Sequence, residues 1–292
     1  MELHEYMEQL RQEIDRYLTL FIKTYTDAPV LNEAMLYSAS NGGKRLRPVL
    51  LLIMLEAFGV DRKNGMSAAG ALEMIHTYSL IHDDLPAMDN DDLRRGKPTN
   101  HKIYGEAMAI LAGDGLLTDA FGMLVEDDNL SAEIRVELVG ALSVLAGSTG
   151  MIAGQVMDIT AESSPVDLNK LKRIHHLKTG RLIEFACLAA GYIAEQNDET
   201  RAYLSQYAGH LGLAFQIQDD ILDVEGNPEI IGKTVGSDIT NNKSTYVSLL
   251  GLDEAKQMLA DEITSALVVL EKLPADTELL KQLTLYVASR DR

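Results

Sequence analysis

Apolar side chains recur along this chain at intervals of three and four residues, the spacing that places them on one face of an α-helix. One such stripe near the N-terminus is formed by Leu3, Met7, Leu10, Ile14, Tyr17, Leu18 and Phe21, and one near the C-terminus by Leu279, Leu280, Leu283, Tyr286 and Val287. Alternating runs rich in β-branched residues, which would indicate strands, are absent from the sequence. The pattern predicts an all-α protein.

Short stretches of glycine, proline and polar residues separate the predicted helices. They lie at residues 26–29, 59–65, 126–131, 163–165, 196–200, 225–238 and 273–276. None is long or simple enough in composition to be a flexible interdomain linker. We therefore expect residues 1–292 to form one helical domain.

The longest stretch without a charge is Leu138–Met157, which contains four glycines. It is long enough to span a membrane but only weakly apolar. The spacing Gly150-x-x-x-Gly154 would let another helix approach closely. We expect a buried central helix here and no transmembrane segment, and the polar, acidic N-terminus shows no signal peptide.

The composition of the chain excludes some classes of partner and some kinds of chemistry. The chain is 46% hydrophobic and carries a formal net charge of −18, which disfavours nucleic acids and anionic membranes as general partners. Its single cysteine, Cys187, lies in an apolar helical run, so we expect a core side chain and not a nucleophile. No disulfide can form within the chain, as suits a reducing compartment.

The densest polar stretch runs from His82 to Lys97, HDDLPAMDNDDLRRGK, and directly follows an apolar helical run. Pro86 should end that helix, because proline lacks a backbone N–H and disfavours helix at the preceding residue. In a continuing helix Asp83 and Asp89 would lie about 240° apart around the axis, whereas a loop can bring them together. Converging carboxylates favour a hard cation such as Mg²⁺, and the arginines that follow can hold phosphate. The alternative is a charged loop at a helix end, without a ligand.

A second acidic motif makes that alternative weaker. The segment FQIQDDILD places Asp219 and Asp223 four residues apart, on one face of a predicted helix, with apolar neighbours. Two such motifs could close on opposite sides of one polyphosphate.

Three cations cluster in the segment Asn41–Pro48, NGGKRLRP. Its glycines and Pro48 bracket a turn, which would expose backbone amides and positive charge to an anion. On these residues alone an ordinary basic helix start is the more common interpretation.

His76 would lie about 20° from Asp83 around the helix axis, two turns away. The two side chains would therefore project from the same face of the helix.

Together these motifs resemble those of the trans-prenyltransferases, the isoprenyl diphosphate synthases. The resemblance rests on Asp-Asp-x4-Asp followed by Arg-Arg and on the distant Asp-Asp-x-x-Asp, extends from about Asn41 to the C-terminus, and is greatest to the bacterial farnesyl diphosphate synthases. It implies a single polyprenyl synthetase domain, folded as an isoprenoid-synthase helical bundle around an apolar cavity. It also implies a cytoplasmic homodimer.

The resemblance further implies roles for individual residues. The ligands of Mg²⁺, three ions with Mn²⁺ as a possible substitute, would be Asp83, Asp84, Asp89, Asp219 and Asp223. Isopentenyl diphosphate would be held by Lys44, Arg47, His76 and Arg95, and the allylic diphosphate by Arg94, Lys178 and Lys233, with Lys243 assisting. Gly180 is expected to break the helix at Lys178–Gly180, where Thr179 would present polar atoms to a carbocation. Gln216 would also contact substrate. The catalytic set would be Asp83, Asp89, Lys178, Thr179 and Asp219.

The expected reaction joins isopentenyl diphosphate to dimethylallyl diphosphate and then to geranyl diphosphate. Tyr78 precedes Asp83 by five residues, about 7.5 Å along the helix, and its ring could form the floor that stops the product at farnesyl diphosphate. One alternative is that Tyr78 is a core aromatic and another residue forms the floor. A separate alternative is that the protein is a geranylgeranyl diphosphate synthase.

Two other classes of protein use similar motifs. A terpene cyclase or diphosphate hydrolase would not need a second diphosphate site at Lys44, Arg47 and His76. A regulatory subunit of a heteromeric prenyl synthase should lack one acidic motif, whereas this chain has both.

Overall fold

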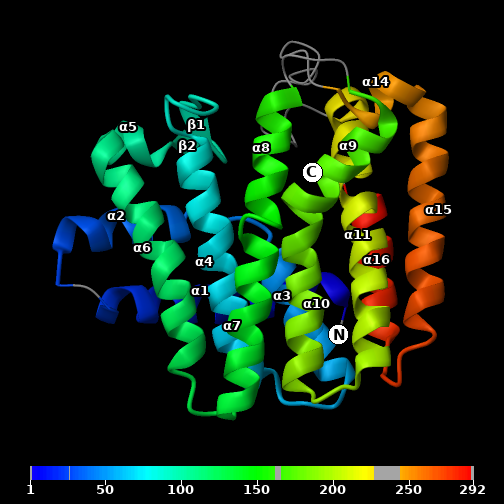
Figure 1. Ribbon diagram of the computed structural model, residues 1–292, viewed down its shortest axis with the longest axis horizontal. Helices are drawn as coiled ribbons and strands as arrows, with labels where there is room; N and C mark the ends of the chain where they lie inside the picture. The colour runs from blue at the N-terminus through cyan, green and yellow to red at the C-terminus, as the bar shows by residue number, and fades with distance from the viewer. Residues whose placement is uncertain (1, 26, 162–165, 227–243, 291–292) are drawn as a thin grey trace. The chain divides into compact units, whose positions relative to one another are not determined.

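The computed structural model describes residues 2–25, 27–161, 166–226 and 244–290. Over these residues the chain is almost wholly helical, so the predicted all-α class is confirmed (Figure 1). The α-helices are α1 Leu3–Tyr25, α2 Pro29–Ala39, α3 Leu46–Ala57, α4 Met66–Asp83, α5 Asn100–Tyr104, α6 Glu106–Val125, α7 Ala132–Ala146, α8 Met151–Ala161, α9 Leu168–His175, α10 Arg181–Ile193, α11 Asp198–Glu225, α14 Tyr246–Leu250, α15 Leu252–Leu270 and α16 Glu278–Ser289. A 3-10 helix η1 spans Arg62–Gly65, a π-helical turn η2 spans His176–Gly180, and the strands β1 Leu93–Arg94 and β2 Lys97–Pro98 form one small hairpin.

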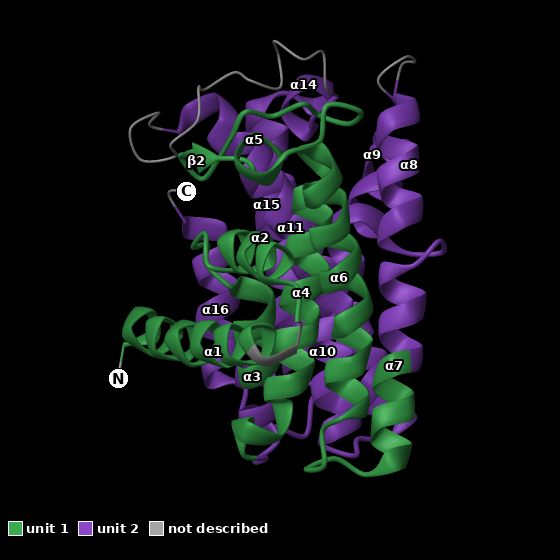
Figure 2. Ribbon diagram, turned by 90° about the vertical axis from the view of Figure 1, so that its left-hand side faces the viewer, with its two compact units in different colours: residues 1–52, 61–139 green, residues 53–60, 140–292 purple. Residues whose placement is uncertain are grey.

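The chain groups into two compact units (Figure 2). Unit 1 contains residues 1–52 and 61–139, and unit 2 contains residues 53–60 and 140–292. Compact units of this kind can belong to one domain, so the single domain expected from the sequence stays a prediction.

Unit 1 is built around α4, most of whose side chains are buried. The first turns of α4 are rich in alanine, and Gly70 follows them. A Cβ at Gly70 would overlap the sulfur of Met123 on α6 and crowd the Tyr17 ring on α1. These small residues therefore let α1 and α6 pack closely against α4.

In unit 2, α10 and α11 lie side by side, and α11 also packs against α15 and α16 (Figure 1). Tyr207 on α11 is fully buried, and its hydroxyl lies 2.9 Å from that of Thr284 on α16. Cys187 on α10 is also fully buried, and burial raises the pKa of its thiol. A buried, protonated thiol is a poor nucleophile, which agrees with the core position expected for it.

The prediction of one buried helix over Leu138–Met157 is wrong. The stretch contains the end of α7 and the start of α8, separated by residues 147–150. The Thr149 hydroxyl donates to the carbonyl of Val144 at 3.1 Å, and such side-chain bonds compete with helical ones. Val144 and Val156 are exposed, so the stretch is not buried on all sides.

By length and hydropathy alone, two helical stretches of the described chain could cross a membrane: Glu106–Val125 and Ala132–Ala161. The second is interrupted where α7 gives way to α8. The absence of a transmembrane segment therefore stays a prediction.

Candidate active site

The first acidic motif begins where α4 ends, at Asp83. The backbone N–H of Asp89 donates to the carbonyl of Asp83 at 2.9 Å, and that of Asn90 donates to the carbonyl of Leu85 at 3.1 Å. The chain thus turns back on itself around Pro86. The predicted return of Asp89 to the side of Asp83 is confirmed, and both side chains are at least partly accessible.

The arginines that follow lie on the hairpin of β1 and β2. Arg94 pairs with Lys97 across the two strands, and Arg95 and Gly96 form the turn with φ angles of +54° and +76°. Positive φ at both positions is the geometry of a tight two-residue hairpin turn. Because of this turn the two arginine side chains have different partners. Arg94 contacts the first acidic motif, and Arg95 contacts the segment at residues 41–48, here called the basic loop.

Arg94 forms a close ion pair with Asp84. Its Nε and Nη2 lie 2.7 and 2.5 Å from one carboxylate oxygen, and a longer contact of 3.4 Å reaches Asp91. Burial raises the pKa of Asp84, although Arg94 opposes that shift. The predicted metal ligand Asp84 and the predicted diphosphate ligand Arg94 are therefore partners of each other here, and both assignments stay predictions.

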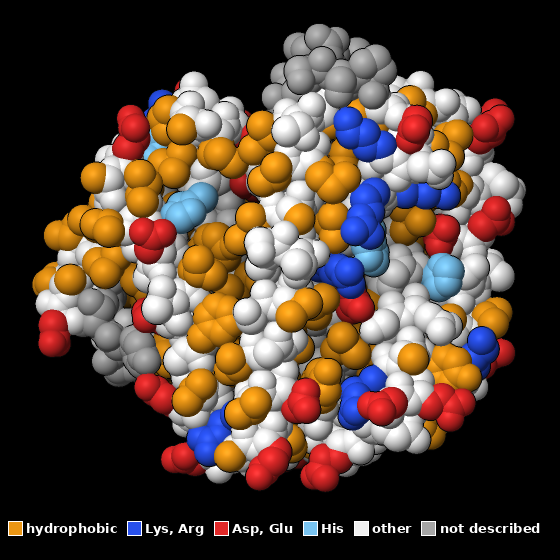
Figure 3. Space-filling view, viewed as in Figure 1, with side chains coloured by type: hydrophobic (Ala, Val, Ile, Leu, Met, Phe, Trp, Pro, Cys, Tyr) orange, Lys and Arg blue, Asp and Glu red, His pale blue; other side chains and the backbone are white. Residues whose placement is uncertain are grey.

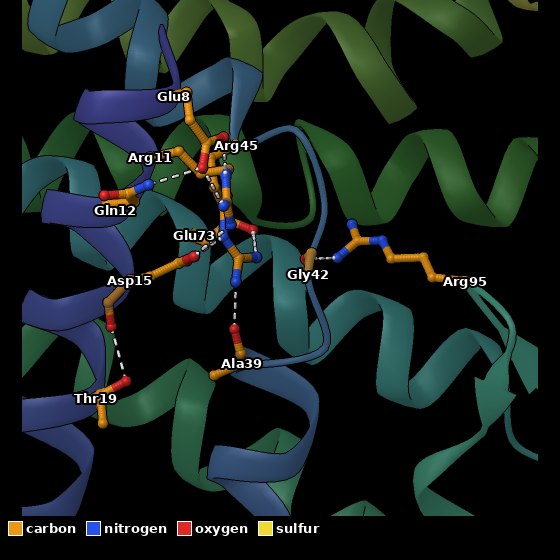
Figure 4. Close-up of polar contacts among 10 residues, drawn as sticks. All are labelled: Glu8, Arg11, Gln12, Asp15, Thr19, Ala39, Gly42, Arg45, Glu73 and Arg95. Carbon is orange, nitrogen blue, oxygen red and sulfur yellow. Dashed lines mark hydrogen bonds and ion pairs between the residues drawn. The ribbon is translucent and has the colours of Figure 1, made fainter. Parts of the chain in front are cut away.

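Arg95 packs against the loop that carries the basic cluster (Figure 4). Its guanidinium donates to the carbonyl of Gly42, and a Cβ at Gly43 would overlap that guanidinium. Gly43 also has a φ of +114°, which L side chains rarely adopt. Asn41 donates to the carbonyl of Arg94 at 3.2 Å. Gly43 is thus needed for the hairpin and the basic loop to meet.

His76 on α4 lies within the electrostatic reach of this cluster. Burial lowers the pKa of His76 well below its usual value, and the charges of Arg47, Arg95, Arg45 and Arg94 lower it further. Burial and the neighbouring arginines also lower the pKa of Arg95. Crowded cations that disfavour further positive charge form a site suited to an anion. The charges of Arg47, Arg94 and Arg95, three of the residues predicted to bind diphosphates, therefore act together at His76, a fourth.

Arg45 has a different role from its neighbours Lys44 and Arg47. Its side chain is 1% exposed and pairs with Asp15 on α1 at 2.8 Å and with Glu73 on α4 at 2.6 Å (Figure 4). It also donates to the carbonyl of Ala39, at the end of α2. Arg45 therefore ties the basic loop to three helices, and its absence from the predicted ligands agrees with this buried position.

Tyr78 lies inside unit 1, one turn of α4 before His82, with 6% of its surface exposed. Burial raises the pKa of Tyr78 to about 12, with a further contribution from the charge of Asp83. The ring therefore stays neutral at physiological pH. Its role as the floor of a product cavity stays a prediction.

The second acidic motif occupies the end of α11, in unit 2. Asp219 and Asp223 are both partly exposed, whereas Asp220 is buried. The Asp220 carboxylate accepts from the backbone N–H of Tyr246 at 2.8 Å and from the side-chain amide of Gln216 at 3.3 Å. The motif thus contains two accessible carboxylates and one that fixes the start of α14.

Thr179 and Gln216, both predicted to contact substrate, lie together. The Thr179 hydroxyl donates to the amide oxygen of Gln216 at 3.3 Å. The expected helix break at Lys178–Gly180 is instead the π-helical turn η2, which continues into α10. Such turns often occur at functional sites. A Cβ at Gly154 on α8 would overlap the backbone of this turn, which explains the glycine there.

Two residues near these sites were not found from the sequence. Asp158 on α8 forms a 2.6 Å ion pair with Lys178. Arg290, just after α16, pairs with Asp219 at 2.7 Å, donates to the carbonyl of Phe215 at 2.8 Å and lies 4.0 Å above its ring. The only signal for Arg290 is its place in a basic C-terminal segment, and no local signal marks Asp158.

The described residues contain no group of three or more His, Cys, Asp or Glu side chains that could hold a metal ion by themselves. Mg²⁺ in phosphate-transferring sites is typically held by one or two carboxylates together with substrate phosphates, and accessible oxygen donors of this kind are present in both motifs. The predicted ligands Lys233 and Lys243 lie outside the described residues.

Comparison with known proteins agrees with these features. A family model described as Polyprenyl synthetase matches residues 28–283. The farnesyl diphosphate synthase of Micrococcus luteus is 53% identical over 262 residues, which cover 90% of each chain. That of Bacillus subtilis (strain 168) is 47% identical over 292 residues, 99% of each chain. The crystal structure of an FPP/GFPP synthase from Zymomonas mobilis matches 98% of this chain and 99% of its own, with a TM-score of 0.88 and 39% identity. Because the matched region contains both acidic motifs and the basic loop, the chain belongs to the polyprenyl synthetase family.

Proposed function

We propose that this protein joins isopentenyl diphosphate to dimethylallyl diphosphate and then to geranyl diphosphate, producing farnesyl diphosphate. The observation that carries the proposal is the cluster of arginines around His76 in a chain of net charge −18 that also contains two carboxylate motifs. One diphosphate can then be bound through metal ions and the other directly by cations. A terpene cyclase or a diphosphate hydrolase binds only one diphosphate. The full-length relatives named farnesyl diphosphate synthase support the same activity.

The metal ligands would be Asp83, Asp89, Asp219 and Asp223, with Asp84 exchanging its bond to Arg94 for one to the metal. These hard oxygen donors suit Mg²⁺, with Mn²⁺ as a substitute, and the family resemblance implies three ions. When bound, the ions stabilise the negative charge that develops on the leaving diphosphate.

The allylic diphosphate would also be bound by Arg94 and Lys178. Lys178 would exchange its bond to Asp158 for one to a phosphate oxygen. Lys233 and Lys243 would add positive charge to the same group. These cations favour ionisation of the allylic C–O bond, because they stabilise the departing diphosphate more than the intact substrate.

Lys44, Arg47, Arg95 and His76 would hold isopentenyl diphosphate. A neutral imidazole can donate one hydrogen bond to a phosphate oxygen while the arginines supply the charge. So held, the double bond of isopentenyl diphosphate attacks the allylic cation. The proton then lost is accepted by the released diphosphate, as the family resemblance implies.

The allylic cation needs partial negative charge close to it, and it must be protected from water. The hydroxyl of Thr179 and the amide of Gln216 place oxygen atoms beside η2, and we propose that they stabilise the cation. The apolar helices exclude water, which would otherwise quench it.

An exposed apolar surface on unit 1 supports the proposed homodimer. Figure 3 shows hydrophobic side chains over the region of α5 and α6, and Ile103, Ile110, Leu111 and Val125 are between 44% and 54% exposed. Exposed apolar side chains gathered on one face commonly mark an interface. We propose that a second copy of the chain covers it, and that the dimer is cytoplasmic.

The test uses purified protein, Mg²⁺, dimethylallyl diphosphate and labelled isopentenyl diphosphate, with dephosphorylated products separated by chain length. We expect mainly a C15 product from the wild type and a shift to C20 or longer from Tyr78→Ala. No condensation would refute the prenyltransferase assignment. A C20 product from the wild type would instead identify a geranylgeranyl diphosphate synthase. An unchanged C15 product from a folded Tyr78→Ala variant would place the floor at another residue.

A further inference from the structure

His82 is the last residue of α4 before Asp83, and it has no part in the proposed function. It lies four residues after Tyr78, on the same helix face. The two rings meet edge to face, with centroids 5.7 Å apart and an interplanar angle of 77°. This arrangement is favourable beyond simple burial, because the positive edge of one ring meets the negative face of the other.

His82 is itself held by α6. Its Nε2 lies 3.0 Å from the carbonyl oxygen of Ile110, and since a carbonyl only accepts, the ring nitrogen donates. A Cβ at Gly113 would overlap three atoms of the His82 ring. The ring therefore occupies space that only glycine leaves open on α6. Tyr78 thus contacts a ring whose own position is fixed by a hydrogen bond and by the absence of a side chain.

We propose that His82 is a specificity-determining residue: it holds the ring of Tyr78 in the position that ends chain growth at C15. The inference rests on the proposed function, in which Tyr78 forms the floor of the product cavity. It adds His82 as the residue that supports the Tyr78 ring. An aromatic ring stops a growing chain only if it does not rotate aside when the chain presses on it. The ring contact with His82, anchored through Ile110 and Gly113, opposes that rotation.

Two substitutions should remove the support from different sides. His82→Ala deletes the ring, and Gly113→Ala displaces it, because the new Cβ takes its place. Each should raise the ratio of C20 to C15 product about two- to tenfold, the change expected from an edge-to-face contact. His82→Gln, which keeps a donor for Ile110 but lacks the ring, should raise the ratio in the same way.

The double variant His82→Ala/Gly113→Ala provides the sharper test. If Gly113 acts only through the His82 ring, the double variant should have the same product ratio as His82→Ala alone. Gly115→Ala is the matched control on α6, because its Cβ would meet the flexible Met35 side chain and not His82. We expect the control to keep the wild-type ratio.

Products are measured by chromatography under excess isopentenyl diphosphate, and folding by far-UV circular dichroism and melting temperature. The product ratio is informative even where total turnover falls, because a merely structural role lowers both products together. Wild-type ratios in folded His82→Ala and His82→Gln proteins would overturn the role of His82 while leaving the proposed function intact. A wild-type product other than C15 would overturn the proposed product, and this inference with it.

Discussion

Arg45 offers the clearest test of how the basic loop is held in place. Replacing it by methionine keeps much of its volume but removes the positive charge between Asp15 and Glu73. The Glu73 side chain is only 3% exposed, so it cannot be solvated in place of its lost partner. The backbone carbonyl of Ala39 would also lose its bond to Arg45.

The expected effect on stability is large. Removing one partner of a buried ion pair costs about 3–5 kcal/mol, because the other charge is left without compensation. Each kcal/mol lowers the melting temperature of a protein of this size by about 2–4 °C. We therefore expect Arg45→Met to melt about 10 °C below the wild type. The exposed pair of Lys256 and Glu225, with side chains 46% and 44% exposed, is the control, and Lys256→Gln should cost less than about 1 kcal/mol.

The double variant Arg45→Met/Glu73→Leu separates stability from function. Apolar replacement of both partners of a buried ion pair is often neutral or stabilising, so we expect much of the lost stability to return. The basic loop would still lack its anchor, so we expect a raised KM for isopentenyl diphosphate in both the single and the double variant. Guanidinium denaturation followed by circular dichroism measures the first effect and steady-state kinetics the second. A loss below about 1 kcal/mol in Arg45→Met would refute the reasoning, since no buried charge could then have been left unpaired.

Three further predictions concern the proposed metal ligands and substrate-binding residues. Asp83→Ala and Asp219→Ala should each lower turnover by at least about 10³-fold at saturating Mg²⁺, as expected on loss of a major electrostatic stabiliser; turnover within tenfold of wild type would contradict this. Arg95→Gln should raise the KM for isopentenyl diphosphate much more than that for geranyl diphosphate, and equal effects in steady-state kinetics would contradict the division of roles between the arginines. The lowered pKa of His76 keeps its ring neutral in the folded protein. The unfolded chain therefore binds more protons below about pH 6.5, and the free energy of unfolding falls as the pH falls. His76→Gln should therefore lose less melting temperature than wild type between about pH 7.5 and pH 5.5.

The features predicted correctly from the sequence depend on local chemistry. Apolar spacing gives the helical class, and Pro86 ends α4 within a few residues of its position. The return of Asp89 to Asp83 follows from that stop, because the loop contains too few residues to travel far. The pairing of Asp219 with Asp223 follows from helical geometry alone.

The errors occur where local signals compete. Residues 138–157 are uncharged and apolar enough to suggest one helix, but Thr149 and the glycines at 147 and 150 end it. Gly180 suggests a break at Lys178, yet η2 keeps the helix continuous by widening one turn.

The partners of Arg45 and Asp219 could not be predicted, because they come from remote parts of the sequence. Arg290 lies 71 residues from Asp219, yet its side chain is 3% exposed and bonded to that carboxylate. A buried guanidinium needs such a partner, since desolvation of an isolated charge is costly. A cation that binds Asp219 must therefore compete with Arg290, just as one that binds Asp84 must compete with Arg94. In both motifs the arginine offsets carboxylate repulsion, and it would become available to an anion if a metal ion took its place.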